Sequence, residues 1–218
     1  MKTNVTELVF ILDRSGSMHG LEADTLGGFN SMLEKQKNEE GEAYVSTVLF
    51  NDHSAVIHDR VDIRNVEPMT REQYQVYGCT ALLDAVGGAI HHIGNIHKYA
   101  RAEDVPAKTL FVIITDGMEN ASHKYSLSKV KKMIERQKEK HGWEFLFLGA
   151  NIDAVSTAGA MGIGEDRAVK YCCDEQGTAL NYDAIGKVAS CLRKNLSVPG
   201  SWKREIERDE AERGRISE

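Results

Sequence analysis

The stretch that decides the fold is the apolar run Leu8-Val9-Phe10-Ile11-Leu12 together with the residues that follow it, Asp13-Arg14-Ser15-Gly16-Ser17. Five large apolar residues without a polar break predict a strand buried on both faces, which is typical of a parallel sheet covered by helices. A carboxylate and two hydroxyls, spaced by two residues, follow where this strand ends. Ligands of open α/β sheets bind outside the carboxyl ends of the strands, and hard cations prefer oxygen ligands. The stretch therefore indicates a site for a cation such as Mg²⁺ rather than for zinc or copper.

A second predicted strand ends in the same way. Residues 110–115 (LFVIIT) lead directly into Asp116-Gly117, and between the two strands Thr80 opens a strongly periodic helix. If the two strands are neighbours, Asp13 and Asp116 lie in one crevice, where two carboxylates repel unless a cation or a proton lies between them. The predicted oxygen ligands are Asp13, Ser15, Ser17, Thr80 and Asp116.

The rest of the chain alternates between strand and helix patterns. Apolar runs predict further strands at about residues 44–50, 55–58, 144–148 and 168–171, and helical periodicity marks segments near 21–37, 82–93, 127–141, 154–161 and 185–192. The turn at residues 51–54 is too short for a crossover, so it predicts an antiparallel hairpin. We expect a Rossmann-like, doubly wound α/β fold: a mostly parallel six-stranded sheet with one antiparallel edge strand and helices on both faces. In such a sheet the first and fourth strands lie side by side at the switch point.

Composition limits both the domain organisation and the function. The 218 residues suffice for one sizeable core, which we assign to residues 1–196, while the highly charged residues 197–218 are expected to form a solvated helix or a frayed tail.

The three histidines near the second long helix, at positions 91, 92 and 97, are expected to be solvated.

Charge and hydropathy exclude several classes of partner and location. A net charge of −6 without a basic stripe argues against nucleic-acid binding, and the short apolar runs argue against a membrane span. Residues 1–4 lead directly into a core strand, so no secretory signal is expected and we predict a cytoplasmic protein. The four cysteines show no disulfide framework, which favours reduced thiols.

The spacing of these residues resembles the metal-ion-dependent adhesion site of the von Willebrand factor A family. That site has an Asp-x-Ser-x-Ser motif followed by a distant Thr and a distant Asp, and the resemblance covers roughly residues 4–195, most like an intracellular bacterial member. It implies Mg²⁺, with Mn²⁺ or Ca²⁺ as alternatives. Ser15, Ser17 and Thr80 would bind the ion directly, and Asp13 and Asp116 largely through water. An open coordination position would then bind an Asp or Glu of a partner protein, so the resemblance implies a non-enzymatic binding module. An AAA ATPase or a stress-response component is the kind of partner that such members have.

Other interpretations remain open at this point. Ser15, Ser17 and Thr80 could cap helices, and Asp116-Gly117 could be an ordinary turn. An aspartate at a strand end also serves Mg²⁺-dependent phosphoryl transfer of the haloacid dehalogenase type, but that motif is Asp-x-Asp and here the second position is Ser15. A third alternative is a regulatory scaffold in which the metal is purely structural.

Overall fold

The computed structural model describes residues 2–214 of the chain, so the last four residues of the predicted tail lie outside the described residues. The strands are β1 (Lys2–Asp13), β2 (Glu42–Phe50), β3 (Ser54–Asp62), β4 (Pro106–Thr115), β5 (Glu144–Gly149) and β6 (Ala168–Lys170). The helices are α1 (Glu22–Lys37), α2 (Leu82–Tyr99), α3 (Leu127–His141), α4 (Ala154–Ala160), α5 (Glu175–Arg193) and α6 (Arg204–Gly214).

The six strands form one sheet in the order β3-β2-β1-β4-β5-β6. Every neighbouring pair is parallel except β2 and β3, which form the antiparallel hairpin at one edge. This confirms the predicted fold class. The first and fourth strands are neighbours at the centre of the sheet, as doubly wound topology requires.

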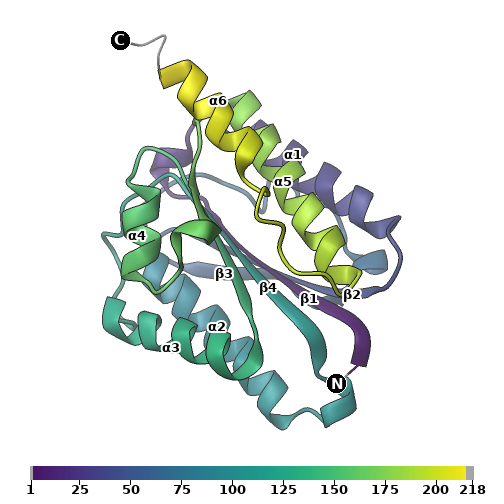
Figure 1. Cartoon of the computed structure of the whole chain (residues 1–218). Coiled ribbons are helices and arrows are strands. Elements are labelled where there is room, and N and C mark those ends of the chain that lie inside the picture. The colour runs from purple at the N-terminus through teal and green to yellow at the C-terminus, as the bar shows by residue number, and fades with distance from the viewer. Residues whose placement is uncertain (1, 215–218) are drawn as a thin grey trace.

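Helices cover both faces of the sheet. Figure 1 shows α1, α5 and α6 on one face and α2, α3 and α4 on the other. The apolar run of β1 supplies both layers, because successive side chains of a strand point to opposite faces. Leu8, Phe10 and Leu12 pack into the core under α1 and α5. Val9 and Ile11 pack into the core under α2 and α3.

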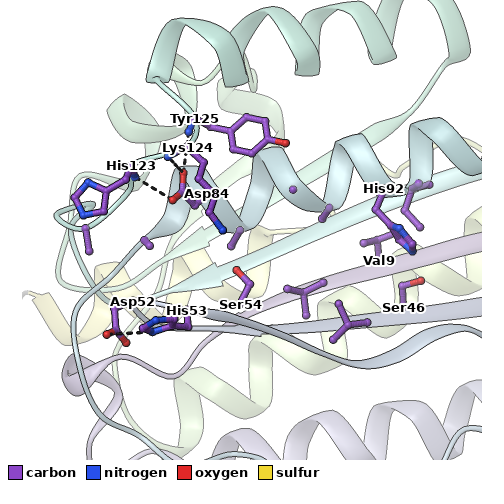
Figure 2. A pocket seen from close by; sticks show the side chains of 18 of the residues that line it. Val9, Ser46, Asp52, His53, Ser54, Asp84, His92, His123, Lys124 and Tyr125 are labelled. Atoms are coloured by element: carbon purple, nitrogen blue, oxygen red, sulfur yellow. Dashed lines mark hydrogen bonds and ion pairs between the residues drawn. The ribbon is translucent and has the colours of Figure 1, made fainter.

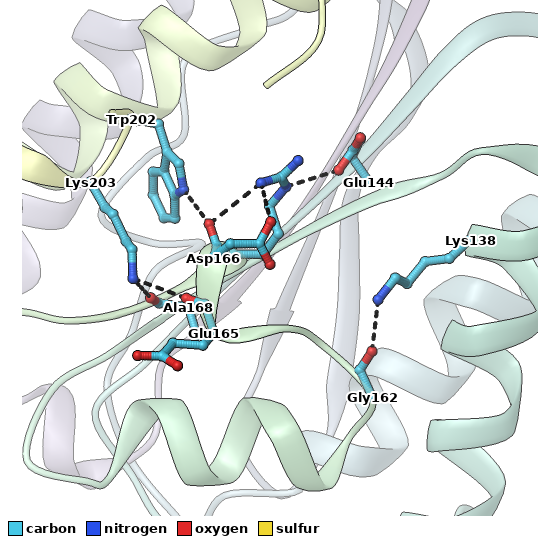
Figure 3. Close-up of polar contacts among 9 residues, drawn as sticks. Lys138, Glu144, Gly162, Glu165, Asp166, Ala168, Trp202 and Lys203 are labelled. Carbon is cyan, nitrogen blue, oxygen red and sulfur yellow. Dashed lines mark hydrogen bonds and ion pairs between the residues drawn. The ribbon is translucent and has the colours of Figure 1, made fainter. Parts of the chain in front are cut away.

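The segment after Pro199 is anchored to the core. Trp202 is buried and its indole Nε1 donates to the carbonyl of Asp166 at 2.8 Å, while the Lys203 ammonium donates to two backbone carbonyls at 2.9 and 3.0 Å (Figure 3). Ile206 of α6 is also buried, in the core cluster that contains α5. Residues 204–214 therefore form a helix that is docked on the core. The pattern of charges had predicted either a solvated helix or a frayed tail. The division of the chain at residue 197 stays a prediction.

One of the three histidine predictions was wrong. His91 and His92 are exposed, but the side chain of His97 is only 10% exposed, and its Nε2 lies 2.5 Å from Oε2 of Glu7. Glu7 is fully buried in β1 and also accepts a hydrogen bond from Nε of Arg60 at 2.7 Å. A buried carboxylate needs such partners, because an unpaired charge is costly in the interior. His97 could not be placed from sequence because its partner lies 90 residues away.

Among the described residues, no helix combines the length and the apolar character that a membrane crossing needs.

A glycine in α1 provides a stability prediction. A Cβ on Gly28 would lie 2.3 Å from a ring carbon of the buried Tyr182 in α5, whereas a Cβ on its neighbour Gly27 would meet nothing within 4 Å. We expect Gly28→Ala to lower the free energy of unfolding by about 1–2 kcal/mol, because overpacking outweighs the gain in helix propensity. Gly27→Ala should leave it unchanged or raise it by up to about 1 kcal/mol. Urea unfolding of both variants checks this, and equal stabilities would contradict it.

Candidate metal centre

The topology brings the two predicted aspartates to one edge of the sheet. Asp13 is the last residue of β1, and Asp116 directly follows the neighbouring parallel strand β4. Both side chains are buried, at 1% and 3% exposure. The carboxyl ends of the two central strands therefore meet where the sequence predicted a crevice.

Three hydroxyls lie together beside this edge. Thr80 Oγ1 donates to Ser15 Oγ at 3.0 Å, and Ser15 Oγ lies 3.1 Å from Ser17 Oγ. Gly117 completes the cluster because it has no side chain. A Cβ at this position would lie 2.5, 3.0 and 3.3 Å from the hydroxyl oxygens of Thr80, Ser17 and Ser15. Three loops thus converge on one small space lined by oxygen.

Asp13 is held rigidly behind the hydroxyls. Its Oδ1 accepts the backbone N–H of Ser15 at 2.7 Å, and its Oδ2 accepts the hydroxyl of Thr115 at 2.6 Å. Its backbone carbonyl accepts the hydroxyl of the buried Tyr74 at 2.5 Å. Burial raises the pKa of the Asp13 carboxyl above its ordinary value, and the hydrogen bonds from Thr115 and Ser15 offset only part of that effect.

Asp116 is positioned by residues that the sequence did not single out as site residues. Its Oδ1 accepts a hydrogen bond from Nδ2 of Asn151 at 2.6 Å, and its Oδ2 accepts the thiol of Cys173 at 3.2 Å. Burial, together with the neighbouring Asp116 carboxylate, raises the pKa of the Cys173 thiol to about 12. Asn151 adopts a left-handed φ of 45°, which is uncommon for a residue other than glycine. Its position three residues beyond the strand predicted at 144–148 was the one available signal.

The hydroxyls of Ser15 and Thr80 do not serve as helix caps. Helix α2 begins at Leu82, so its N-cap residue is Ala81, and Thr80 makes no capping hydrogen bond. Instead, Glu119 Oε2 accepts the backbone N–H of Leu83 at 2.8 Å, and Ser122 Oγ accepts that of Asp84 at 3.0 Å. Ser15 likewise makes no side-chain cap to the short helix that follows it. The capping interpretation is therefore wrong for Ser15 and Thr80.

The loop after β4 holds Thr80 in place. Asn120 Oδ1 accepts the backbone N–H of Thr80 at 2.8 Å, and the N–H of Asn120 donates to the carbonyl of Thr80 at 3.0 Å. Met118 of the same loop directly follows Gly117 in the chain and is 74% exposed.

The donor set fits a hard cation. Within residues 2–214, no three His, Cys, Asp or Glu side chains gather as metal ligands, so a cation at this edge would depend on hydroxyl oxygens. Such a set of two carboxylates and three hydroxyls suits Mg²⁺, Mn²⁺ or Ca²⁺ far better than zinc.

Solved structures match this chain over most of its length. A von Willebrand factor type A protein from Catenulispora acidiphila matches with a TM-score of 0.56 at 12% identity, over 87% of this chain and 43% of that chain. The PilB minor pilin of Streptococcus sanguinis, as its D319A mutant, matches with a TM-score of 0.60 at 11% identity, over 93% and 63%. Proximal thread matrix protein 1 from the mussel byssus, solved with a zinc-occupied metal-ion-dependent adhesion site, gives 0.55 at 13% identity, over 85% and 46%. A scan against models of protein families and a search of curated proteins found no match.

The chain has the von Willebrand factor A fold.

At these low identities the likeness establishes the von Willebrand factor A fold alone, and it confirms the fold that the resemblance implied. The chain spans 43–63% of the length of these three proteins. The parts of those proteins outside the match therefore say nothing directly about this chain.

The raised pKa of Asp13 provides a pH prediction in a chelating buffer. The folded state holds the Asp13 proton more tightly than the unfolded state does. The free energy of unfolding therefore falls as pH rises from the ordinary pKa of 3.8 through the raised pKa of the folded state. Asp13→Asn removes that ionisation. The stability of the wild type relative to Asp13→Asn should therefore fall as pH rises through this range, and then level off. Urea unfolding of both proteins between pH 3.5 and 8 measures the difference, and a difference independent of pH would contradict the prediction.

Proposed function

We propose that this protein is a divalent-cation-dependent protein-binding module. The observation that carries the proposal is the convergence of the Ser15, Ser17 and Thr80 hydroxyls around the space that Gly117 leaves open. Asp13 and Asp116 flank this cluster from the ends of β1 and β4. Mg²⁺ is the proposed cation, with Mn²⁺ or Ca²⁺ as alternatives.

The cation would supply a Lewis-acidic position that accepts a carboxylate oxygen of a partner. The residues of the chain then have separate tasks. The three neutral hydroxyls would bind the cation without neutralising its positive charge, which would then remain available to an anionic group of the partner. Hydrogen bonds fix the carboxylate of Asp13 through Ser15 and Thr115, and that of Asp116 through Asn151 and Cys173. The exposed Met118 provides apolar surface next to this position. The partner group that fits is an Asp or Glu side chain.

The solved relatives support this reading in general terms. One of them, from the mussel byssus, is described with a metal in its adhesion site. None of the four cysteines forms a disulfide, which is compatible with the proposed cytoplasmic location. From the resemblance, we propose an AAA ATPase or a stress-response component as the partner, and an intracellular bacterial setting.

Affinity capture from the source cell tests the proposed function. We expect a partner to be retained in Mg²⁺, and lost both in EDTA and with Asp13→Ala as bait. A partner that is retained after chelation would instead favour a scaffold with a purely structural metal. Melting temperatures of bait and variant, measured in parallel, separate loss of binding from loss of fold.

A phosphoryl-transfer enzyme is the alternative that the same edge of the sheet allows. In an Asp-x-Asp enzyme the second carboxylic acid protonates the leaving group, whereas Ser15 offers only a hydroxyl here. We therefore expect no turnover of p-nitrophenyl phosphate in Mg²⁺. Turnover that Asp13→Asn abolishes would favour the enzyme.

A further inference from the structure

A cavity of about 580 Å³ adjoins the candidate metal centre and lies between α2 and the β2–β3 hairpin (Figure 2). Ala81 and Ala121 both line it. Ala81 directly follows Thr80 in the chain, and the backbone N–H of Ala121 donates to the carbonyl of Thr80 at 3.2 Å. A chain segment that is bound at the proposed cation can therefore continue into this cavity.

The middle of the cavity is apolar because the side chains that face it are small or aliphatic. Helix α2 contributes Ala85, Gly88 and Ala89, and the strands contribute Val48 and Val56. A Cβ on Gly88 would meet no atom within 4 Å, so the space in front of this helix is open. Val56 is 56% exposed, and covering its apolar surface would be favourable. An apolar side chain of a partner fits in this space.

The rim of the cavity is acidic. Asp52, Asp59 and Asp84 line it with a single lysine, so three negative charges stand against one positive charge when histidines are counted as neutral. Asp84 accepts the backbone N–H groups of residues 123–125 at 2.8–2.9 Å. Burial raises the pKa of Asp84, but these N–H groups and the Lys124 ammonium outweigh burial, so the pKa is lowered and the carboxylate is ionised. The charge of Lys124 thus acts on Asp84.

The other two aspartates have no lysine or arginine as partner among the ion pairs of the described residues. Asp52 lies 3.2 Å from Nδ1 of His53, and Asp59 lies 2.8 Å from Nε2 of His92. A neutral imidazole N–H orients a carboxylate but leaves its charge in place. The side chains of Asp52 and Asp59 are 42% and 52% exposed, so a basic group of a partner can reach both. Figure 2 shows Asp52 toward one end of the cavity and His92 toward the other.

The length of the cavity limits the spacing of a partner's side chains. From Ala81 to His92 the helix rises by about 16 Å, at about 1.5 Å per residue. An extended chain covers this distance in about five residues, at roughly 3.3 Å per residue. Gly88 lies about two-thirds of the way along. An apolar side chain about three residues from the cation-binding carboxylate, and a basic side chain about five residues from it, therefore fit along one extended segment.

We propose that this cavity is the second half of the partner site, and that it binds an apolar and a basic side chain of the same segment whose Asp or Glu binds the cation. The inference rests on the proposed function. Two anchors on one segment bind more tightly than either alone, because the second binds intramolecularly. The acidic rim also disfavours a segment that is acidic throughout. The partner motif therefore combines one acidic, one apolar and one basic residue.

A random peptide library displayed on phage tests this motif. Peptides are selected on the immobilised full chain in Mg²⁺ and released with EDTA. We expect the released peptides to share an Asp or Glu, an apolar residue about three positions away and a Lys or Arg about five positions away. Gly88→Leu fills the cavity without a clash, and Asp59→Asn removes the charge at its far end. Synthetic copies of the peptides should bind each variant about tenfold or more weakly than the wild type.

Two matched variants control for general effects. Gly27→Leu places the same side chain on an open position of α1, and Asp183→Asn removes a carboxylate of α5 that is 44% exposed. Both should bind the peptides like the wild type. Released peptides without the apolar and basic residues, or peptides that bind Gly88→Leu or Asp59→Asn as tightly as the wild type, would overturn this inference alone. A selection that yields no metal-dependent peptide would overturn the proposed function as well. Melting temperatures show whether the variants are folded.

Discussion

Gly117→Ala is expected to weaken the binding of Mg²⁺ and Mn²⁺ on the order of a hundredfold while leaving the chain folded. The added Cβ would lie 2.5 Å from Thr80 Oγ1 and 3.0 Å from Ser17 Oγ, so these hydroxyls must rotate away. The backbone of Gly117 has no positive φ, so alanine can adopt its conformation. The substitution therefore disturbs the arrangement of the oxygens and removes none of them.

Isothermal titration calorimetry with Mn²⁺ measures this effect. Gly159→Ala is the matched control, because a Cβ at that position would meet nothing within 4 Å, and its affinity should equal that of the wild type. A Gly117→Ala protein that binds Mn²⁺ as tightly as the wild type would show that the hydroxyl cluster is not where the cation binds.

Arg60→Met is expected to cause the largest loss of stability, about 3 kcal/mol. The substitution removes one of the two partners of Glu7, which is fully buried at the centre of the sheet. The other partner is His97, which contacts the second oxygen of the same carboxylate. Removing one member of a buried ion pair is costly because the remaining charge stays in the interior.

A double variant separates the ionic contribution from packing. Glu7→Leu combined with Arg60→Met removes both charges, so it should recover part of the loss, with a coupling energy of about 1–3 kcal/mol. The exposed pair formed by Arg64 and Asp62 in the same region is the control. Arg64→Met should change the free energy of unfolding by less than about 1 kcal/mol in urea unfolding. Equal losses for Arg60→Met and Arg64→Met would contradict the prediction.

The sequence predicted those parts of the molecule that depend on local patterns. Uninterrupted apolar runs located β1 and β4, and the short turn at residues 51–54 predicted the antiparallel edge. The rule for the switch point then placed Asp13 beside the strand that leads to Asp116. Gly142 directly follows the helix predicted near 127–141, and it has the left-handed conformation that ends helices.

The parts that could not be predicted depend on contacts between distant residues. Asn151 and Cys173 reach Asp116 across 35 and 57 positions in the sequence. The docking of Trp202 on the carbonyl of Asp166 spans 36 positions, and no periodicity in a highly charged segment indicates it. A single sequence carries no signal for such pairs, because each of these residues, taken alone, could equally well face the solvent.

Locating Mn²⁺ by anomalous scattering in crystals of the protein tests the proposed cation site most directly. We expect one ion within about 2.5 Å of the hydroxyl oxygens of Ser15, Ser17 and Thr80, with Asp13 and Asp116 in its outer shell. The three hydroxyls would then no longer be hydrogen-bonded to one another. At saturating Mn²⁺, a hydroxyl cluster without an ion, or an ion bound only elsewhere on the molecule, would contradict the proposed site.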